Sequence, residues 1–215
     1  MIQLNLHPHA KLNVLCLGAH CDDIEIGCGG TLLKMKNAGK LGHVTWVVFS
    51  SNDTRRKEAT DAAGYFLEGI QDRNIVIHRF RDGYLPFLAA EVKDAFEALK
   101  QSPAPDIIFT HYRHDRHQDH RLVSDLTWNT FRNQMVLEYE IPKWDGDLGI
   151  PGAFVHIEEA ILNEKISYLH KAYASQAGKH WFDNETFRAL PRLRGMESAV
   201  NYAEAFYLRK AILDF

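Results

Sequence analysis

Short apolar runs alternate with amphipathic segments along the first half of the chain. Four apolar runs have the length of buried strands: residues 12–17, 44–49, 74–78 and 106–110. Three segments between them carry apolar side chains at helical spacing: residues 31–39, 59–67 and 92–99. Gly39 is expected to end the first of these helices. This alternation predicts a mostly parallel sheet with helices on both faces, a three-layer α/β/α, Rossmann-like fold.

The second half of the chain has a weaker pattern. Residues 136–141 and 153–157 are candidate strands, and residues 158–174 are expected to form a long helix. Residues 142–152 contain three glycines and two prolines and form the longest turn-like stretch. Too little chain follows this stretch to build an independent core, so we expect residues 1–215 to form a single domain.

Composition restricts the class of protein. The apolar fraction of 46% and the charged fraction of 25% are those of an ordinary globular protein. A formal net charge of -3 argues against nucleic acid as a partner. Three cysteines without a CxxC pair favour a reducing compartment. Residues 1–8 lack the pattern of a secretory leader, and no stretch approaches the roughly 20 apolar residues of a membrane helix. We therefore expect a cytoplasmic protein with no membrane partner.

Polar residues gather where the first strand meets the first helix. The stretch GAHCDDIEIGCGGTL, residues 18–32, places His20, Asp22 and Asp23 directly after the strand and before a glycine-rich run. Open α/β proteins build their sites at such corners. His20 and Asp23 are three residues apart at a turn, so both can bind one divalent metal such as zinc. Asp22 would then be left free beside the metal.

A dinucleotide site is the alternative interpretation of this corner. Residues 27–30 offer a G-x-G sequence, and Asp53 follows the second strand, where the ribose-binding acid of such sites lies. However, Leu32 occupies the position of the third glycine. Carboxylates also stand between the strand and the glycines, where they would repel a pyrophosphate.

A second cluster follows the fourth strand. Residues 111–120 contain four histidines, one at every third position: His111, His114, His117 and His120. Steps of three rotate by about 60° in an α-helix, so neighbouring members such as His117 and His120 share a face but all four do not. The carboxyl ends of the first and fourth strands are expected at one edge of the sheet, so the two clusters can meet. Three protein ligands and an open position are typical of hydrolytic zinc sites.

Both clusters resemble the signatures of a known family, the LmbE-like (PIG-L) zinc-dependent deacetylases, which remove acetyl groups from N-acetylglucosamine-type sugars. Residues 19–25 resemble the A-H-P-D-D-E signature, and residues 117–120 resemble H-P-D-H. Weaker matches occur at residues 55–58, 82–85, 175–176 and 202–206. Cys21 and Gln118 replace the usual prolines, and Glu25 comes one position late.

This resemblance implies a reaction and a set of roles. One zinc ion per chain would be held by His20, Asp23 and His120, with water completing the site. Asp22 would be the general base. His117, protonated and oriented by Asp119, would stabilise the oxyanion.

The predicted function is a zinc-dependent hydrolase that removes an acetyl group from an N-acetylated sugar or sugar conjugate. Its partner would be this small molecule, and a homo-oligomer is compatible with the sequence. Arg55 is a candidate for binding a phosphate or hydroxyl group of the substrate, and Asp82 for accepting from a sugar hydroxyl. Two alternatives remain: a non-catalytic metal-binding or scaffold protein, and a nucleotide-binding Rossmann enzyme. A scaffold would not need Asp22 and His117.

Overall fold

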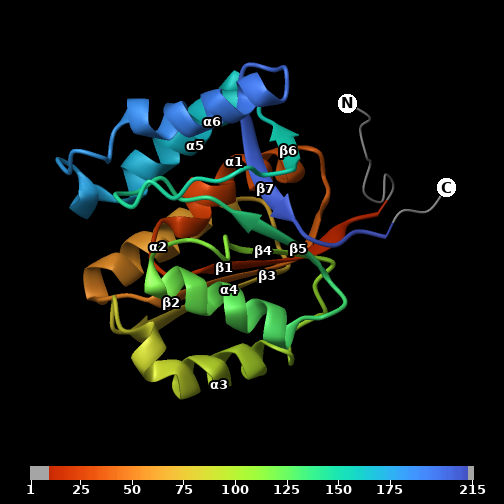
Figure 1. The fold of residues 1–215 in the computed structure, drawn as a ribbon, viewed down its shortest axis with the longest axis vertical. Coiled ribbons are helices and arrows are strands. Elements are labelled where there is room, and N and C mark those ends of the chain that lie inside the picture. The colour runs from red at the N-terminus through yellow and green to blue at the C-terminus, as the bar shows by residue number, and fades with distance from the viewer. Residues whose placement is uncertain (1–9, 213–215) are drawn as a thin grey trace.

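The computed structural model describes residues 10–212, which form one mixed sheet of seven strands with helices on both faces (Figure 1). The strands are β1 (Leu12–Gly18), β2 (Leu41–Ser50), β3 (Arg73–Phe80), β4 (Ile107–His111), β5 (Met135–Tyr139), β6 (Ala153–His156) and β7 (Ala203–Leu208). The α-helices are α1 (Asp23–Asn37), α2 (Asp53–Phe66), α3 (Ala89–Leu99), α4 (Gln118–Thr130), α5 (Glu159–Ala172) and α6 (Asn184–Glu197). Two short 3-10 helices are η1 (Leu85–Leu88) and η2 (Ala174–Gln176). The predicted α/β fold class is confirmed.

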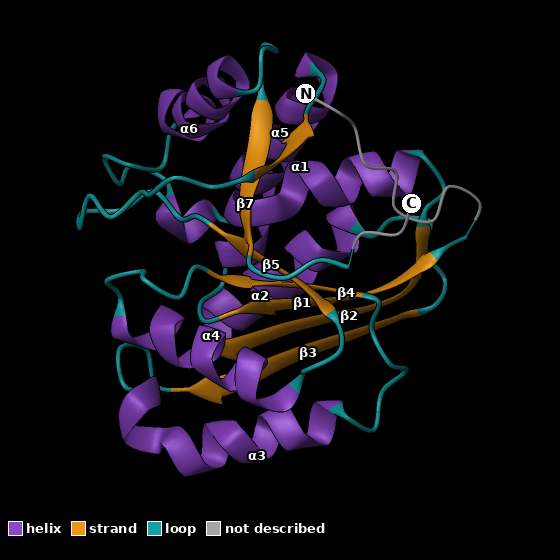
Figure 2. Cartoon of the chain, turned by 45° about the vertical axis from the view of Figure 1, so that its right-hand side comes forward, coloured by secondary structure: helices purple, strands orange, loops and turns teal. Residues whose placement is uncertain are grey.

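The order of the strands places the two predicted clusters side by side. The sheet runs β3-β2-β1-β4-β5-β7-β6, and its first five strands are parallel. Strand β7 runs antiparallel to both β5 and β6 and forms, with β6, an edge that the sequence did not predict (Figure 2). Because β1 and β4 are parallel neighbours, their carboxyl ends, and the residues that follow them, lie at the same edge.

The core has two parts, one on each face of the sheet. Along β1, Val14 and Cys16 pack on the face covered by α1, α2 and α5, whereas Leu15 and Leu17 face α3 and α4. Figure 1 shows α3 and α4 below the sheet and the other helices above it. This alternation is the period-two pattern of a strand buried on both sides, as expected for a central parallel strand.

Helix α1 begins at Asp23, eight residues before the predicted start at residue 31, and this prediction was wrong. The glycines at residues 27–30 lie inside the helix, where they allow close packing rather than a loop. A Cβ on Gly27 would lie 2.2 Å from the ring of Tyr139, and one on Gly29 would lie 2.7 Å from the ring of Phe66. A phosphate-binding loop needs its glycines at the turn, so the dinucleotide interpretation loses its main feature.

The second half differs from the prediction in its helices and its last strand. Strand β6 and helix α5 agree with the expected segments, and β5 ends two residues early. Helices α4 and α6 and strand β7 were not assigned from the pattern. In β7, Glu204 interrupts the apolar run, yet it is buried because it pairs with Lys165 at 2.7 Å. A charged residue buried in such an ion pair interrupts the run of apolar residues from which a strand is predicted, so the strand is missed.

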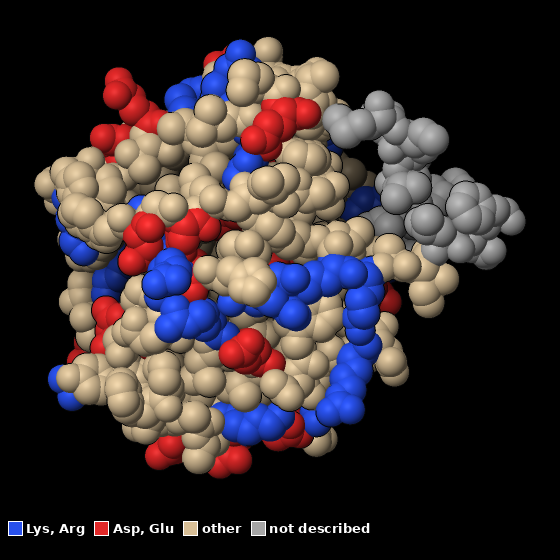
Figure 3. Space-filling model, in the orientation of Figure 1, with Lys and Arg blue, Asp and Glu red and all other residues tan. Residues whose placement is uncertain are grey.

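The surface is locally basic despite the small negative net charge. On the face shown in Figure 3, Lys and Arg side chains form a band across the middle and right side, with acidic side chains between them. Within residues 10–212 each helix is too short or too polar to cross a membrane. The stretch 1–8, on which the expectation of no leader rested, lies outside the described residues.

Candidate active site

The first corner is a tight turn between β1 and α1. Asp22 has φ of 106°, a left-handed conformation that residues with a side chain rarely adopt. The turn changes the direction of the chain, and helix α1 begins directly after it at Asp23. The Oδ2 atom of Asp23 accepts a hydrogen bond from the backbone N–H of His20 at 2.6 Å. This bond fixes the carboxylate of Asp23 beside the imidazole of His20.

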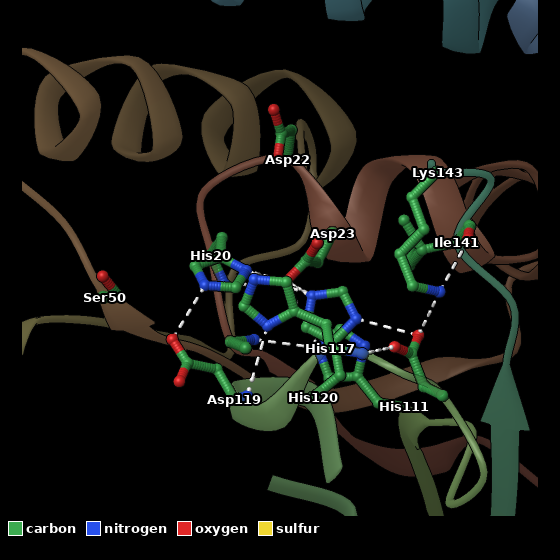
Figure 4. A network of polar contacts seen from close by, with 12 residues as sticks. His20, Asp22, Asp23, Ser50, His111, His117, Asp119, His120, Ile141 and Lys143 are labelled. Atoms are coloured by element: carbon green, nitrogen blue, oxygen red, sulfur yellow. Dashed lines mark hydrogen bonds and ion pairs between the residues drawn. The ribbon is translucent and has the colours of Figure 1, made fainter. Parts of the chain in front are cut away.

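The second corner joins β4 to α4. His111 is the last residue of β4, and His117 is the N-cap of α4. The Nδ1 atom of His117 accepts from the backbone N–H of Asp119 at 3.2 Å, in the manner of a capping side chain. His120 lies one turn further along the buried side of the helix. Figure 4 shows His20, His111, His117, His120 and Asp23 gathered around one centre.

The three predicted metal ligands converge on this centre. His20 Nδ1 lies 3.1 Å from His120 Nε2 and 3.4 Å from Asp23 Oδ2, and His120 Nε2 lies 3.6 Å from Asp23 Oδ2. Ligands about 2.0–2.1 Å from a tetrahedral zinc ion are separated by about 3.4 Å. The two imidazoles and one carboxylate are therefore spaced as zinc ligands are, and the donor set fits this ion.

The protonation of His120 and Asp23 suits metal binding, whereas His20 must lose a proton before it can bind a metal. Burial lowers the pKa of His20, but hydrogen bonds to Asp119, Asp23 and Asp82 outweigh burial and raise that pKa well above its usual value. Burial and the nearby His111 lower the pKa of His120 to about 4, so its imidazole is neutral at pH 7. Burial opposes ionisation of Asp23, but His120 and His111 outweigh it and hold the pKa of Asp23 well below its usual range. Metal ligation needs neutral histidine and ionised carboxylate.

Asp115 orients His120 and is a site residue that the sequence analysis missed. Its Oδ2 atom lies 2.9 Å from His120 Nδ1 and 2.8 Å from Lys143 Nζ, and its Oδ1 atom accepts from the His117 N–H at 2.8 Å. The pKa of Asp115 is held well below its usual range, although burial opposes ionisation, because His120 and Lys143 face the carboxylate. An ionised carboxylate only accepts, so His120 Nδ1 donates and Nε2 keeps a lone pair that could bind a metal ion. The signal in the sequence that could have identified Asp115 is its position five residues before His120, a predicted ligand.

Asp119 contacts a different histidine from the one expected. Its Oδ2 atom lies 3.1 Å from His20 Nε2, and the carboxylate also accepts from the N–H groups of Gly83 and Leu85 at 2.8 and 3.1 Å. Its link to His117 runs through the backbone N–H instead. Its carboxylate is held toward His20 by the N–H groups of Gly83 and Leu85. The carboxylate of Asp119 thus contacts His20, one of the three predicted ligands, rather than the ring of His117.

His117 and His111 have different surroundings. Burial and the nearby His20 lower the pKa of His117, and its Nδ1 acts as an acceptor. Its neutral ring therefore carries the proton on Nε2, in contrast to the imidazolium that we expected. His111, which had no predicted role, is fully buried and stacks on His120 with ring centroids 3.9 Å apart. Its Nε2 atom accepts from the Ala19 N–H at 2.9 Å, which joins the two corners.

Asp22 and Arg55 form a pair beside the ligands. Arg55 lies 2.7 Å from Asp22 Oδ2, and its guanidinium also donates to the carbonyl of Cys21. Burial raises the pKa of Asp22 to about 6, and the charge of Arg55 limits the increase. Arg55 was expected to bind substrate, but its guanidinium is occupied by protein groups. Asp82 remains accessible: its side chain is 81% exposed and its carboxylate lies 3.2 Å from His20 Nε2.

The fold and this site define an α/β protein with a cluster of histidines and aspartates, able to hold a metal ion, at the carboxyl edge of its sheet. A family model described as GlcNAc-PI de-N-acetylase (PIG-L) matches residues 15–131, more than half of the chain. The chain belongs to this family.

Individual proteins are similar to this chain in sequence or in fold. The uncharacterized deacetylase YaiS of Escherichia coli (strain K12) is 26% identical over 175 residues, which cover 75% of this chain and 90% of YaiS. The conserved protein TT1542 from Thermus thermophilus is similar in structure, with a TM-score of 0.75, 24% identity and coverage of 95% of this chain and 97% of TT1542. The N,N'-diacetylchitobiose deacetylase from Pyrococcus horikoshii has a TM-score of 0.72 at 22% identity, covering 91% of this chain and 83% of that enzyme.

The fold alone does not fix the reaction. GalB, the 4-carboxy-2-hydroxymuconate hydratase of Pseudomonas putida KT2440, has a TM-score of 0.72 at 16% identity, covering 95% of this chain and 98% of GalB. The function must therefore be argued from the residues of the site.

Proposed function

We propose that residues 1–215 act as one domain, a zinc-dependent deacetylase that hydrolyses the acetyl amide of an N-acetylated sugar or sugar conjugate. The observation that carries this proposal is the convergence of His20, Asp23 and His120 at separations of 3.1–3.6 Å, with a second carboxylate next to them in sequence. Residues His20, Asp23 and His120 would hold the ion. A bound zinc ion would polarise the acetyl carbonyl and lower the pKa of water at the site.

Asp22 is the general base of this proposal. Its Oδ2 atom is held by Arg55, which leaves the other carboxylate oxygen to take a proton from the attacking water. A pKa of about 6 keeps the carboxylate largely ionised at pH 7 while bringing its basicity closer to that pH. Asp22 can pass the same proton to the departing amine, so that water adds across the C–N bond and acetate leaves.

His117 and Asp82 complete the proposed machinery. The Nε2–H of His117 is available to donate to the carbonyl oxygen as negative charge develops on it. This assigns His117 a neutral donor role, since its Nδ1 already accepts from the backbone. The exposed carboxylate of Asp82 is placed beside His20, where it can accept from a substrate hydroxyl.

Site variants test the division of labour between the two adjacent aspartates. Asp22→Asn should retain about one zinc per chain and lose most turnover, whereas Asp23→Ala and His120→Ala should lose the metal. Metal content by mass spectrometry and acetate release by a coupled assay measure the two effects separately. Loss of zinc in Asp22→Asn, with zinc retained in Asp23→Asn, would exchange the two roles.

A substrate panel tests the sugar. Because Arg55 is bound to Asp22, it no longer argues for a phosphate group, and phosphorylated conjugates enter the panel only for comparison with free and nucleotide-linked sugars. Zinc-loaded protein should release acetate from one or more of free, phosphorylated and nucleotide-linked N-acetylhexosamines. Release only from an acetyl amide without a sugar would retain the hydrolase and exclude the sugar.

A further inference from the structure

The guanidinium of Arg55 is enclosed on several sides. One nitrogen donates both to the carbonyl of Cys21 and to Asp22 Oδ2, and the other donates to Glu58 Oε2 at 3.0 Å. The ring of Tyr173 packs against its face, with the guanidinium carbon 4.8 Å from the ring centroid. Side-chain exposure is 17% for Arg55 and 10% for both Asp22 and Glu58. In such surroundings the ion pairs are screened less than on an open surface.

Glu58 is itself held from the far end of α5. Ser175, in η2, donates to Glu58 twice: its N–H bonds Oε1 and its hydroxyl bonds Oε2, both at 2.7 Å. A continuous chain of hydrogen bonds therefore runs from Ser175 through Glu58 and Arg55 to Asp22. It joins residues that are 153 positions apart in sequence, as the numbers 22 and 175 show.

We propose that Glu58 and Ser175 are positioning residues that hold the catalytic turn at Asp22 through Arg55. This inference rests on the proposed function, in which Asp22 is the general base. Residues 55–58 and residues 175–176 match the family weakly in sequence but do not contribute to the metal site. The inference gives both segments a common role.

The backbone at Asp22 explains why such support is needed. A residue with a side chain at φ of 106° is strained, and it persists only where its surroundings fix it. Arg55 donates hydrogen bonds to the turn at two points, the carbonyl of Cys21 and the carboxylate of Asp22. Glu58 fixes the guanidinium on the opposite side, so it prevents Arg55 from turning away. Without Glu58, the turn can relax and Asp22 can leave the position from which it accepts a proton.

The side chains of the three proposed metal ligands are held by hydrogen bonds outside this chain. Asp23 is held by the N–H of His20, His20 by Asp119, and His120 by Asp115. Disrupting the chain should therefore lower kcat while leaving KM and zinc content unchanged. A general loss of stability would change kcat, KM and zinc content together.

The test uses Glu58→Gln and Ser175→Ala, each alone and combined with Asp22→Asn. Glu68→Gln, an exposed glutamate just beyond the end of α2, is the matched control. Since Ser175 is exposed, removing its hydroxyl does not open the core. Glu58→Gln should lower kcat about tenfold and Ser175→Ala about threefold, as expected for the loss of hydrogen bonds to charged groups. Ser175→Thr, which keeps the hydroxyl, should retain the parental kcat.

The combined variants distinguish positioning of Asp22 from a structural effect. In the Asp22→Asn background, Glu58→Gln and Ser175→Ala should have no further effect, because the base they position is absent. In metal-free protein, amide hydrogen exchange over residues 18–24 should accelerate in Glu58→Gln but not in Glu68→Gln. Effects that multiply with that of Asp22→Asn, or unchanged exchange in the turn, would overturn the inference. Full turnover in Asp22→Asn alone would instead refute the general base of the proposed function, and this inference with it.

Discussion

Replacing Asp115 by asparagine should weaken zinc binding, although Asp115 is not itself a metal ligand. The side chain is only 2% exposed and receives three donors: the His117 N–H on Oδ1, and His120 Nδ1 and Lys143 Nζ on Oδ2. Asparagine has nearly the same shape but only one oxygen, and its NH2 group donates. Whichever way the amide turns, its NH2 group faces a donor.

The consequence for the metal follows from the tautomer of His120. If the NH2 group faces His120, Nδ1 must accept, and the ring proton moves to Nε2, the atom that would bind zinc. If the oxygen faces His120 instead, the NH2 group meets the His117 N–H and the turn before α4 must shift. Loss of a hydrogen-bond partner behind a metal ligand lowers affinity by about 10- to 100-fold, or about 1.4–2.7 kcal/mol.

Zinc affinity measured by chelator competition at pH 7 tests this expectation. Asp145→Asn is the matched control, since Asp145 is an exposed aspartate in the loop that carries Lys143. It should bind zinc as the parent does. Equal zinc affinity in Asp115→Asn and Asp145→Asn would refute the reasoning that Asp115 sets the tautomer of His120.

Three further variants probe catalysis, packing and pH dependence. His117→Ala should lower kcat about 100-fold with little change in KM, whereas a higher KM with kcat unchanged would argue against a contact made only in the transition state. Gly27→Ala should destabilise the fold by about 3 kcal/mol in denaturant unfolding, because its Cβ would lie 2.2 Å from the Tyr139 ring. A Cβ on Gly64 would have no neighbouring atom within 4 Å, so Gly64→Ala should stabilise α2 by about 0.5–1 kcal/mol. Similar changes in the free energy of unfolding for Gly27→Ala and Gly64→Ala would contradict this packing argument. Burial raises the pKa of Glu25 from 4.5 to about 8, so its contribution to stability is complete below pH 4.5 and lost as pH rises through 8. Glu25→Gln should therefore stabilise metal-free protein at pH 9 and hardly at pH 4.5, whereas parallel stability curves would contradict this.

The layers of the fold and the meeting of the two clusters could be predicted from the sequence. Alternating strands and helices determine a parallel sheet, and the carboxyl edge of such a sheet brings residues 18–23 and 111–120 together. The start of α1 could not be predicted in this way, because glycine is a poor helix former by itself. At Gly27 and Gly29 tertiary contact overrides that preference, since the neighbouring rings leave no room for a Cβ.

The roles around the ligands depend on contacts that no sequence pattern contains. Lys143 reaches Asp115 from a loop 28 residues away, and Arg55 turns inward to Asp22 rather than outward to solvent. Asp119 was assigned to its sequence neighbour His117, whereas its carboxylate contacts His20 in the turn after β1 and only its backbone N–H bonds to His117. Adjacent residues in a sequence motif thus serve different partners in the folded site.

The most direct test of the central claim is a zinc titration of metal-stripped protein with acetate release as the signal. With the N-acetylhexosamine that gives the highest activity, acetate release should rise linearly with added zinc and stop rising at one equivalent per chain. His120→Ala should remain inactive at the same zinc concentrations. Turnover by the metal-stripped protein, or zinc binding that never produces acetate from any acetyl amide, would contradict the claim that His20, Asp23 and His120 form a hydrolytic zinc site.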